Sequence, residues 1–344
     1  MSMPSITHMQ REIMAIPDAV DAMLSDGAEP IKRAAQALAD LDPDLVMTVA
    51  RGSSDHAAAF FKYACALIAG VPVASVGPSI ASVYQSTLRL RQTACLSISQ
   101  SGQSPDIVQL TTAAAAQGAL SIALTNNADS PLAKVGKHAL LLHAGPERSV
   151  AATKTFVNSA VSALWLLAEW RHDSALRDAI FQLPRFLEDA TKTDWSCINH
   201  ALVGRPSLFC LGRGPALAMA QETALKFKET CQIHAEAFSS AEVLHGPVSI
   251  VDEGFPIVAL AAADKAEASM AEVADIFAAK GARVFVTSDM VKTATPLPVI
   301  RTNHPLTDPI ALIVSAYVMI EKVATTSGIN PDAPRHLKKI TETI

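Results

Sequence analysis

The stretch that decides the fold is LVMTVARGSSDHAAAFFKYACALIA, residues 45–69. It begins with the apolar run Leu45–Val49, turns through small residues at Ala50–Ser54, and continues as an alanine-rich helical pattern at Ala57–Ala69. A strand that leads through such a turn into a helix is the first half of a βαβ unit. The turn can also hold an anion, because backbone N–H groups converge at the start of the helix.

The alternation of strand and helix continues along the first half of the chain. Further strands are predicted at Thr93–Ile98 and Ser121–Leu124, and further helices at Asp106–Gln117 and Thr153–Trp170. Apolar strands separated by helices predict a parallel sheet that is covered by helices on both faces.

The same pattern begins again after Pro206. The run Leu208–Leu211 leads through Gly212-Arg213-Gly214-Pro215 into a second helix, much as Val49 leads into the first. Later strands are predicted at Ile257–Ala261, Arg283–Thr287 and Val299–Ile300. We therefore predict an α/β protein of two tandem, doubly wound parallel-sheet domains of the flavodoxin-like type.

The length of 344 residues fits two domains, since one domain usually takes roughly 100–200 residues. One large doubly wound sheet is the alternative, which the linker-like polar stretch Glu188–Asp194 disfavours. Residues Ile6 to Asp40, before the first strand, are expected to form two amphipathic helices, broken near Pro17 and around Asp26-Gly27. The predicted boundaries are 1–40 for this helical segment, 41–190 for the first domain and 195–344 for the second.

Composition excludes several classes of function. The net charge of −5 argues against a nucleic-acid partner, which would require a basic face. Five scattered cysteines and ten histidines show no ligand spacing, so neither a metal nor a cofactor is expected. No secretory signal is visible, and the apolar runs are shorter than the ~20 residues of a membrane span. The expected location is the cytoplasm.

A cluster of hydroxyls follows the strand at Thr93–Ile98. In SISQSGQSPD, residues 97–106, a phosphate would meet serine hydroxyls and the N-terminus of a helix that begins at Pro105. The alternative is that Ser101 and Ser104 merely cap that helix. The candidate ligands of this turn are Ser99, Gln100, Ser101 and Ser104. Ser53 and Ser54 add a second turn, and both turns would lie at the carboxyl ends of strands.

A charged stripe lies on the second predicted helix. Glu222, Lys226 and Glu229 follow at i, i+4 and i+7 and share one face. Amphipathicity alone favours a solvated surface stripe with an ion pair. His245 precedes Gly246-Pro247 and is expected on a loop, where a histidine is either catalytic or simply exposed.

Together these segments resemble the tandem sugar isomerase (SIS) domain family, and within it the isomerase half of glutamine:fructose-6-phosphate amidotransferase. The resemblance covers nearly the whole chain. Its matching segments are residues 8–13, 51–54, 99–102, 150–154, 225–229, 234–237, 245–247 and 334–339.

The resemblance implies a role for each candidate residue. Glu229 would be the isomerisation base, Lys226 its helper and Glu222 a supporting carboxylate. His245 would open the sugar ring from across the interface of a homodimer, so the active site would be shared. Lys339 would form an imine with the ketose, with the neighbouring Lys338 as the alternative. The implied sugar-phosphate contacts are Ser53, Ser54, Ser99, Gln100, Ser101 and Ser104, with Val150 lining the pocket.

Three departures from this family bear on the activity. Arg51 stands where a small residue or cysteine is usual, and Ala333 where a lysine is common. A glutaminase half and a cysteine at position 2 are missing, so glutamine hydrolysis is not expected. The resemblance then implies a deaminase that converts glucosamine 6-phosphate to fructose 6-phosphate and ammonia. The alternatives are a fructosamine-6-phosphate deglycase, a simple aldose-ketose phosphate isomerase and a sugar-phosphate-sensing regulator.

Overall fold

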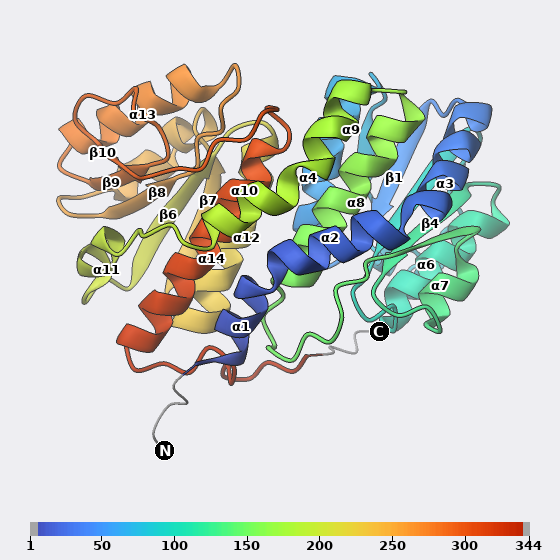
Figure 1. The fold of residues 1–344 in the computed structure, drawn as a ribbon, viewed down its shortest axis with the longest axis horizontal. Helices are drawn as coiled ribbons and strands as arrows, with labels where there is room; N and C mark the ends of the chain where they lie inside the picture. Colours follow the sequence, from blue (N-terminus) through green and yellow to red (C-terminus); the bar gives the residue numbers. More distant parts are fainter. Residues whose placement is uncertain (1–5, 340–344) are drawn as a thin grey trace. The chain divides into compact units, whose positions relative to one another are not determined.

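The computed structural model describes residues 6–339, which form two compact α/β units (Figure 1). We call them the first-sheet unit and the second-sheet unit. The described part of the first-sheet unit comprises residues 18–147, 154–182 and 338–339. The described part of the second-sheet unit comprises residues 6–17, 148–153 and 183–337. Each unit is assembled from separate pieces of the sequence, whereas the predicted domains were contiguous.

The first-sheet unit is built on five parallel strands in the order β2-β1-β3-β4-β5. Every residue of β3 and β4 is buried, because helices cover both faces of the sheet. This explains why these strands are continuous apolar runs without alternation. The strands are β1 (Leu45–Val49), β2 (Val73–Ser75), β3 (Thr93–Ile98), β4 (Leu120–Thr125) and β5 (His138–Leu141).

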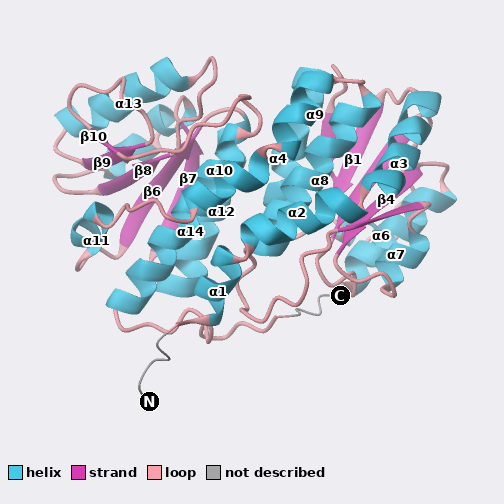
Figure 2. Ribbon diagram, viewed as in Figure 1, coloured by secondary structure: helices cyan, strands magenta, loops and turns pink. Residues whose placement is uncertain are grey.

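Two helical layers enclose this sheet (Figure 2). One layer consists of α3 (Ala28–Leu41), α4 (Ser53–Ile68) and α8 (Lys154–Trp170), with α9 (Ser174–Phe181) packed on α8. The other consists of α5 (Ser79–Ser82), α6 (Pro105–Ala116) and α7 (Pro131–Val135). In that second layer Ile107 and Leu110 of α6 pack with Met47, Val49 and Cys95 of the strands.

The second-sheet unit repeats this topology. Its five parallel strands follow the order β10-β9-β8-β6-β7, and β6 pairs with β7 and β8 as β1 pairs with β2 and β3. Both sheets therefore have the flavodoxin-like order 2-1-3-4-5, which confirms the predicted fold. The strands are β6 (Ser207–Gly212), β7 (His234–Ser239), β8 (Pro256–Ala259), β9 (Arg283–Val286) and β10 (Thr295–Pro296).

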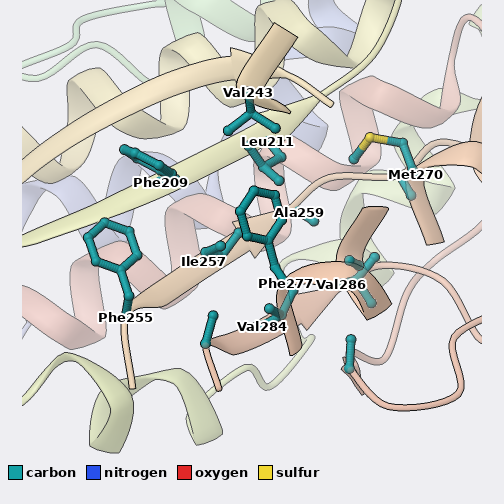
Figure 3. Close-up of a cluster of buried hydrophobic side chains, with 14 residues drawn as sticks. Phe209, Leu211, Val243, Phe255, Ile257, Ala259, Met270, Phe277, Val284 and Val286 are labelled. Atoms are coloured by element: carbon teal, nitrogen blue, oxygen red, sulfur yellow. The ribbon is translucent and has the colours of Figure 1, made fainter. Parts of the chain in front are cut away.

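The hydrophobic core of the second-sheet unit lies on both sides of its sheet. Figure 3 shows the side facing α13 (Glu267–Ala279), where Phe209 and Leu211 of β6 meet Phe277. Successive residues of a strand point to opposite faces, so every second residue joins this cluster. On the other side α12 (Pro215–Lys226) packs against β6, β7 and α14 (Asp308–Thr326), and α14 also contacts α1 (His8–Met14) and α10 (Leu183–Ala190).

Helix α14 has 19 residues and a hydropathy that would also suit a membrane span. In the structure, 78% of its apolar window is buried inside the protein. Among residues 6–339 it is the one helix that meets this test of length and composition, and its burial is that of a core helix.

Some predicted elements differ from the structure. No strand covers Val299–Ile300, and the last short strand lies at Thr295–Pro296 instead. The N-terminal segment forms three helices, α1, α2 (Ile16–Asp26) and α3. Pro17 is the second residue of α2, where its missing N–H costs no helical hydrogen bond. The proline therefore marks the beginning of a helix.

Candidate active site

A pocket of about 320 Å³ opens at the carboxyl ends of β1 and β3 in the first-sheet unit. At this point the strand order reverses, since β2 lies on the other side of β1, and ligands of doubly wound sheets bind at such switch points. The pocket contains most of the predicted phosphate contacts. Its lining residues are Arg51, Gly52, Ser54, Ile98, Ser99, Gln100, Ser101, Ser104, Ile107 and Lys339.

The turn after β1 depends on a glycine at the N-cap of α4. Gly52 has φ +56° and ψ −132°, a conformation that residues with a side chain rarely adopt. Gly214, the N-cap of α12 in the second-sheet unit, has φ +56° and ψ −133°. The predicted repeat is thus a repeat of backbone geometry. Ser53 begins α4 but is not among the residues that line the pocket, whereas Ser54 is.

The turn after β3 is held by its own hydroxyls. Ser99 Oγ accepts from the Gly102 N–H at 3.2 Å, and Ser101 Oγ accepts from the Gln103 N–H at 3.2 Å. Ser104 occupies the N-cap of α6, yet its side chain makes no capping hydrogen bond. The capping alternative is therefore wrong for Ser104. This residue lines the pocket at the positive end of helix α6.

Lys339 reaches the same pocket from the end of the described chain. Its Nζ donates to Glu147 Oε2 at 2.8 Å, and the Glu147 side chain is fully buried. Glu147 also accepts from the backbone N–H and the hydroxyl of Thr155, at 3.2 and 2.7 Å. Lys338 is exposed and is not among the lining residues. These contacts fix the ammonium group of Lys339 in the pocket.

The second-sheet unit holds the predicted charged residues in a cluster. Lys226 Nζ lies 3.1 Å from Glu222 Oε1 and 2.6 Å from Glu229 Oε2. The side chains of Lys226 and Glu222 are 0% exposed, and that of Glu229 is 20% exposed. The interpretation as a solvated surface stripe is therefore wrong. Tyr317 of α14 donates to Glu222 Oε1 at 3.1 Å and closes the inner end of the cluster.

A change of helical geometry sets the position of Glu229. Helix α12 ends at Lys226 and continues as one π turn, Phe227–Cys231, which contains Glu229. Such turns inside helices are rare and often mark functional sites. The π turn leaves Glu229 partly open to solvent while its carboxylate still accepts from Lys226.

The two neighbouring carboxylates keep Lys226 protonated. Burial alone lowers the pKa of this amine, but the attraction of Glu222 and then Glu229 outweighs it and holds the pKa above its ordinary value. Lys226 is therefore a cation at neutral pH. A carboxylate that can exchange a proton, next to a fixed cation, suits proton transfer through a negatively charged intermediate.

Two further predicted residues lie outside this hydrogen-bonded cluster in the described part of the chain. His245 is exposed at the end of the short 3₁₀ helix Glu242–His245, before Gly246 with φ +146°. Within residues 6–339 no recorded hydrogen bond or ion pair joins His245 to the cluster. Val150 is half-buried in the segment 148–153, where the Glu12 carboxylate accepts from the backbone N–H groups of Arg148 and Ser149.

Arg301 lies at the carboxyl ends of β8 and β9 in the second sheet. Its guanidinium donates to the carbonyl oxygens of Ala261 at 3.0 Å and Thr287 at 2.7 Å. It also forms ion pairs with Glu267 at 2.6 Å and Asp308 at 2.8 Å. The two sheets share a topology, but the segment after β8, which corresponds to the hydroxyl-rich turn after β3, is held by this arginine network.

Comparison with known proteins agrees with this architecture. The SIS domain family model matches residues 42–169 and 201–295, which contain β1–β5 and β6–β9. The chain belongs to the SIS domain family. This SIS protein is 31% identical over 328 residues to a glutamine–fructose-6-phosphate aminotransferase (isomerizing) from Sulfolobus acidocaldarius, covering 94% of the chain and 54% of the relative. It thus spans about half the length of the curated relatives that it matches.

Solved structures give the same assignment. A protein from Silicibacter pomeroyi DSS-3, assigned to the phosphosugar isomerases, is 57% identical with a TM-score of 0.93, over 95% of this chain and 100% of that chain. A glucosamine-6-phosphate deaminase from Thermotoga maritima is 17% identical with a TM-score of 0.78, over 98% of this chain and 100% of that chain, which shows the shared fold. The SIS protein is thus placed among phosphosugar isomerases.

Proposed function

We propose that this protein is an isomerase and deaminase of an amino-sugar phosphate, which converts glucosamine 6-phosphate, or a close analogue, to fructose 6-phosphate and ammonia. The observation that carries the proposal is the buried Glu222–Lys226–Glu229 cluster, in which one carboxylate stays partly accessible. A protein that only sensed a sugar phosphate would not require a buried cation beside an accessible carboxylate, because burying charges is costly.

In the proposed reaction, His245 opens the pyranose ring and Glu229 moves the C2 proton to C1. The protonated Lys226 stabilises the negative charge that develops between these carbons. The product of this shift carries an imine at C2, and water adds to that carbon. Loss of ammonia leaves the C2 ketone of fructose 6-phosphate, so one water is consumed for each ammonia released.

The other assignments belong to the same proposal. Ser54, Ser99, Gln100, Ser101 and Ser104 bind the 6-phosphate, with Ser53 and Val150 supporting the site. Lys339, once its amine is deprotonated, condenses with the C2 ketone of the open-chain ketose to form an imine and one water, and hydrolysis of that imine returns the ketose; before this step Glu147 holds the ammonium group. His245 comes from the partner of a homodimer, which accords with its exposure on a short helical turn. We place the protein in the cytoplasm, where sugar phosphates are formed and consumed.

The decisive experiment is an ammonia-release assay with the purified protein. Glucosamine 6-phosphate, its epimers and a set of fructosamine 6-phosphates serve as substrates, with unphosphorylated glucosamine as the control. We expect ammonia and fructose 6-phosphate from a hexosamine 6-phosphate. Release of a free amine from fructosamine 6-phosphates alone would instead identify a deglycase. Aldose-ketose conversion without ammonia would identify a simple isomerase, and binding without turnover would identify a sensor.

A further inference from the structure

Arg51 holds a position in the phosphate pocket that the family resemblance does not explain. Its Nε and Nη2 groups donate to Asp106 Oδ2 at 2.9 and 2.8 Å. Asp106 lies in the first turn of α6 with its side chain 1% exposed, and its other oxygen accepts from the Ile107 N–H at 2.8 Å. The guanidinium is therefore fixed at the beginning of α6, next to Ser104.

The charges at the beginning of α6 set one requirement for phosphate binding. A carboxylate in the first turn of α6 would repel a phosphate bound at that helix terminus, so Asp106 must be neutralised. Arg51 does this with two of its donors. The side chain of Arg51 is still 52% exposed, and within residues 6–339 no hydrogen bond is recorded for its Nη1. An arginine offers five N–H donors in a rigid planar arrangement that suits phosphate oxygens.

We propose that Arg51 is a specificity residue of the phosphate pocket, which donates from Nη1 to the phosphoryl group of the substrate while Asp106 positions its guanidinium. The inference rests on the proposed function, because it takes the pocket as the phosphate site of a sugar. Arg51 adds a second cation to the pocket beside Lys339. This cation favours phosphorylated sugars over neutral ones.

Calorimetric titration with two probes, fructose 6-phosphate and inorganic phosphate, tests this inference. Arg51→Ala should weaken the binding of both by about 10- to 100-fold, the usual contribution of a hydrogen bond to a charged group. The double variant Arg51→Ala/Asp106→Asn also removes the carboxylate that repels the phosphate, so it should bind more tightly than Arg51→Ala but remain weaker than wild type, because the donor from Nη1 is still missing. The matched control is Arg213→Ala, which lies in the equivalent turn of the second sheet and should retain wild-type affinity.

Each other outcome overturns the inference. If the double variant regains wild-type affinity, Arg51 only neutralises Asp106. If Arg51→Ala binds the probes as wild type does, Arg51 makes no phosphate contact, while the proposed function stands. If the wild-type protein binds neither probe, the proposed function fails as well. A second variant covers the case in which Arg51→Ala melts at a lower temperature than wild type. Arg51→Gln keeps a neutral hydrogen-bond donor for Asp106, and it must then show the same loss of affinity for both probes.

Discussion

Lys226 lies between two carboxylates, 3.1 Å from Glu222 Oε1 and 2.6 Å from Glu229 Oε2, and its own side chain has no exposure to solvent. The two carboxylates differ in environment. Glu222 accepts from Tyr317 and faces the core, whereas Glu229 lies on a π turn and remains partly accessible. This asymmetry supports the proposed roles, in which Glu229 exchanges the proton and Glu222 holds the cation.

Replacing Glu229 by glutamine should suppress turnover while leaving phosphate binding intact. The amide keeps the shape but cannot accept a proton, and a positioned general base contributes about 10²- to 10⁴-fold to a rate. Steady-state ammonia release and fructose 6-phosphate titration measure the two effects. Glu272→Gln, on the exposed side of α13, is the control. Equal losses in both variants would remove Glu229 from the mechanism.

Replacing Lys226 by methionine should destabilise the protein strongly. The substitution leaves Glu222 buried without its cation, and breaking a buried ion pair in this way typically costs about 3–5 kcal/mol. Lys192→Met removes a comparable contact, 2.8 Å to Glu188, on the surface. That change should have little effect on stability, because water and salt screen an exposed ion pair. Denaturant unfolding of both variants gives the comparison, and similar midpoints would contradict the structural role of the cluster.

Reductive trapping can show whether Lys339 or Lys338 forms the imine with the sugar. Borohydride added during turnover should attach the sugar to Lys339, whose ammonium is held in the pocket by Glu147. Peptide mass spectrometry locates the adduct. Lys338→Ala should leave trapping unchanged, whereas Lys339→Ala should abolish it. Glu147→Gln should reduce the yield of adduct, and a full yield would show that Glu147 does not position the lysine.

Alanine substitutions at Gly102 and Gly52 would distinguish backbone strain from steric conflict. Both have positive φ, +62° and +56°, so alanine is strained at either position by roughly 1–3 kcal/mol. A Cβ at Gly102 would lie 2.3 Å from Ser130 Oγ, whereas a Cβ at Gly52 meets nothing within 4 Å. Gly102→Ala should therefore lower the melting temperature further and weaken fructose 6-phosphate binding more. A larger effect of Gly52→Ala on melting temperature and binding would contradict this description of the turn at residues 99–104.

Stability should depend on pH through Glu321. Burial raises the pKa of this carboxyl, while the hydrogen bond from Thr7 Oγ1 lowers it in part. The folded protein then binds a proton more tightly than the unfolded chain does. As pH rises from the ordinary pKa of 4.5 through the raised pKa of Glu321 in the folded protein, the free energy of unfolding of wild type decreases. Glu321→Gln does not titrate, so it does not show this decrease. Melting temperatures should agree near pH 4 and separate towards pH 7, and a constant difference would contradict this.

Much of the fold could be predicted because buried parallel strands are apolar throughout. Leu45–Val49 and Thr93–Ile98 are strands with the predicted bounds. The strand at His234–Ser239 was missed because its alanines and Glu236 have low strand propensity, and because it lies at the edge of its sheet, where it is not a continuous apolar run. The very short strand at Val73–Ser75 leaves too few residues for a periodic pattern.

The candidate site was predictable only in part. Hydroxyls at Ser99 to Ser104 were visible in the sequence because one turn contains them all. The burial of Lys226 was not, because helical periodicity says which residues share a face but not what covers it. Glu147 was missed since its partner Lys339 is 192 residues away. Asp106 was likewise missed, because only the fold brings it to Arg51.

Each unit is built from non-contiguous segments of the chain, which limits how this protein can be truncated. The chain leaves one unit and enters the other after residues 17, 147, 153, 182 and 337. A cut after residue 182 keeps the strands and helices of the first-sheet unit together, but it removes α1, which packs on α14, from the second-sheet unit. An isolated second-sheet unit is therefore expected to expose apolar surface of α14, and a reporter or affinity label inserted at a surface loop is a safer tool than truncation.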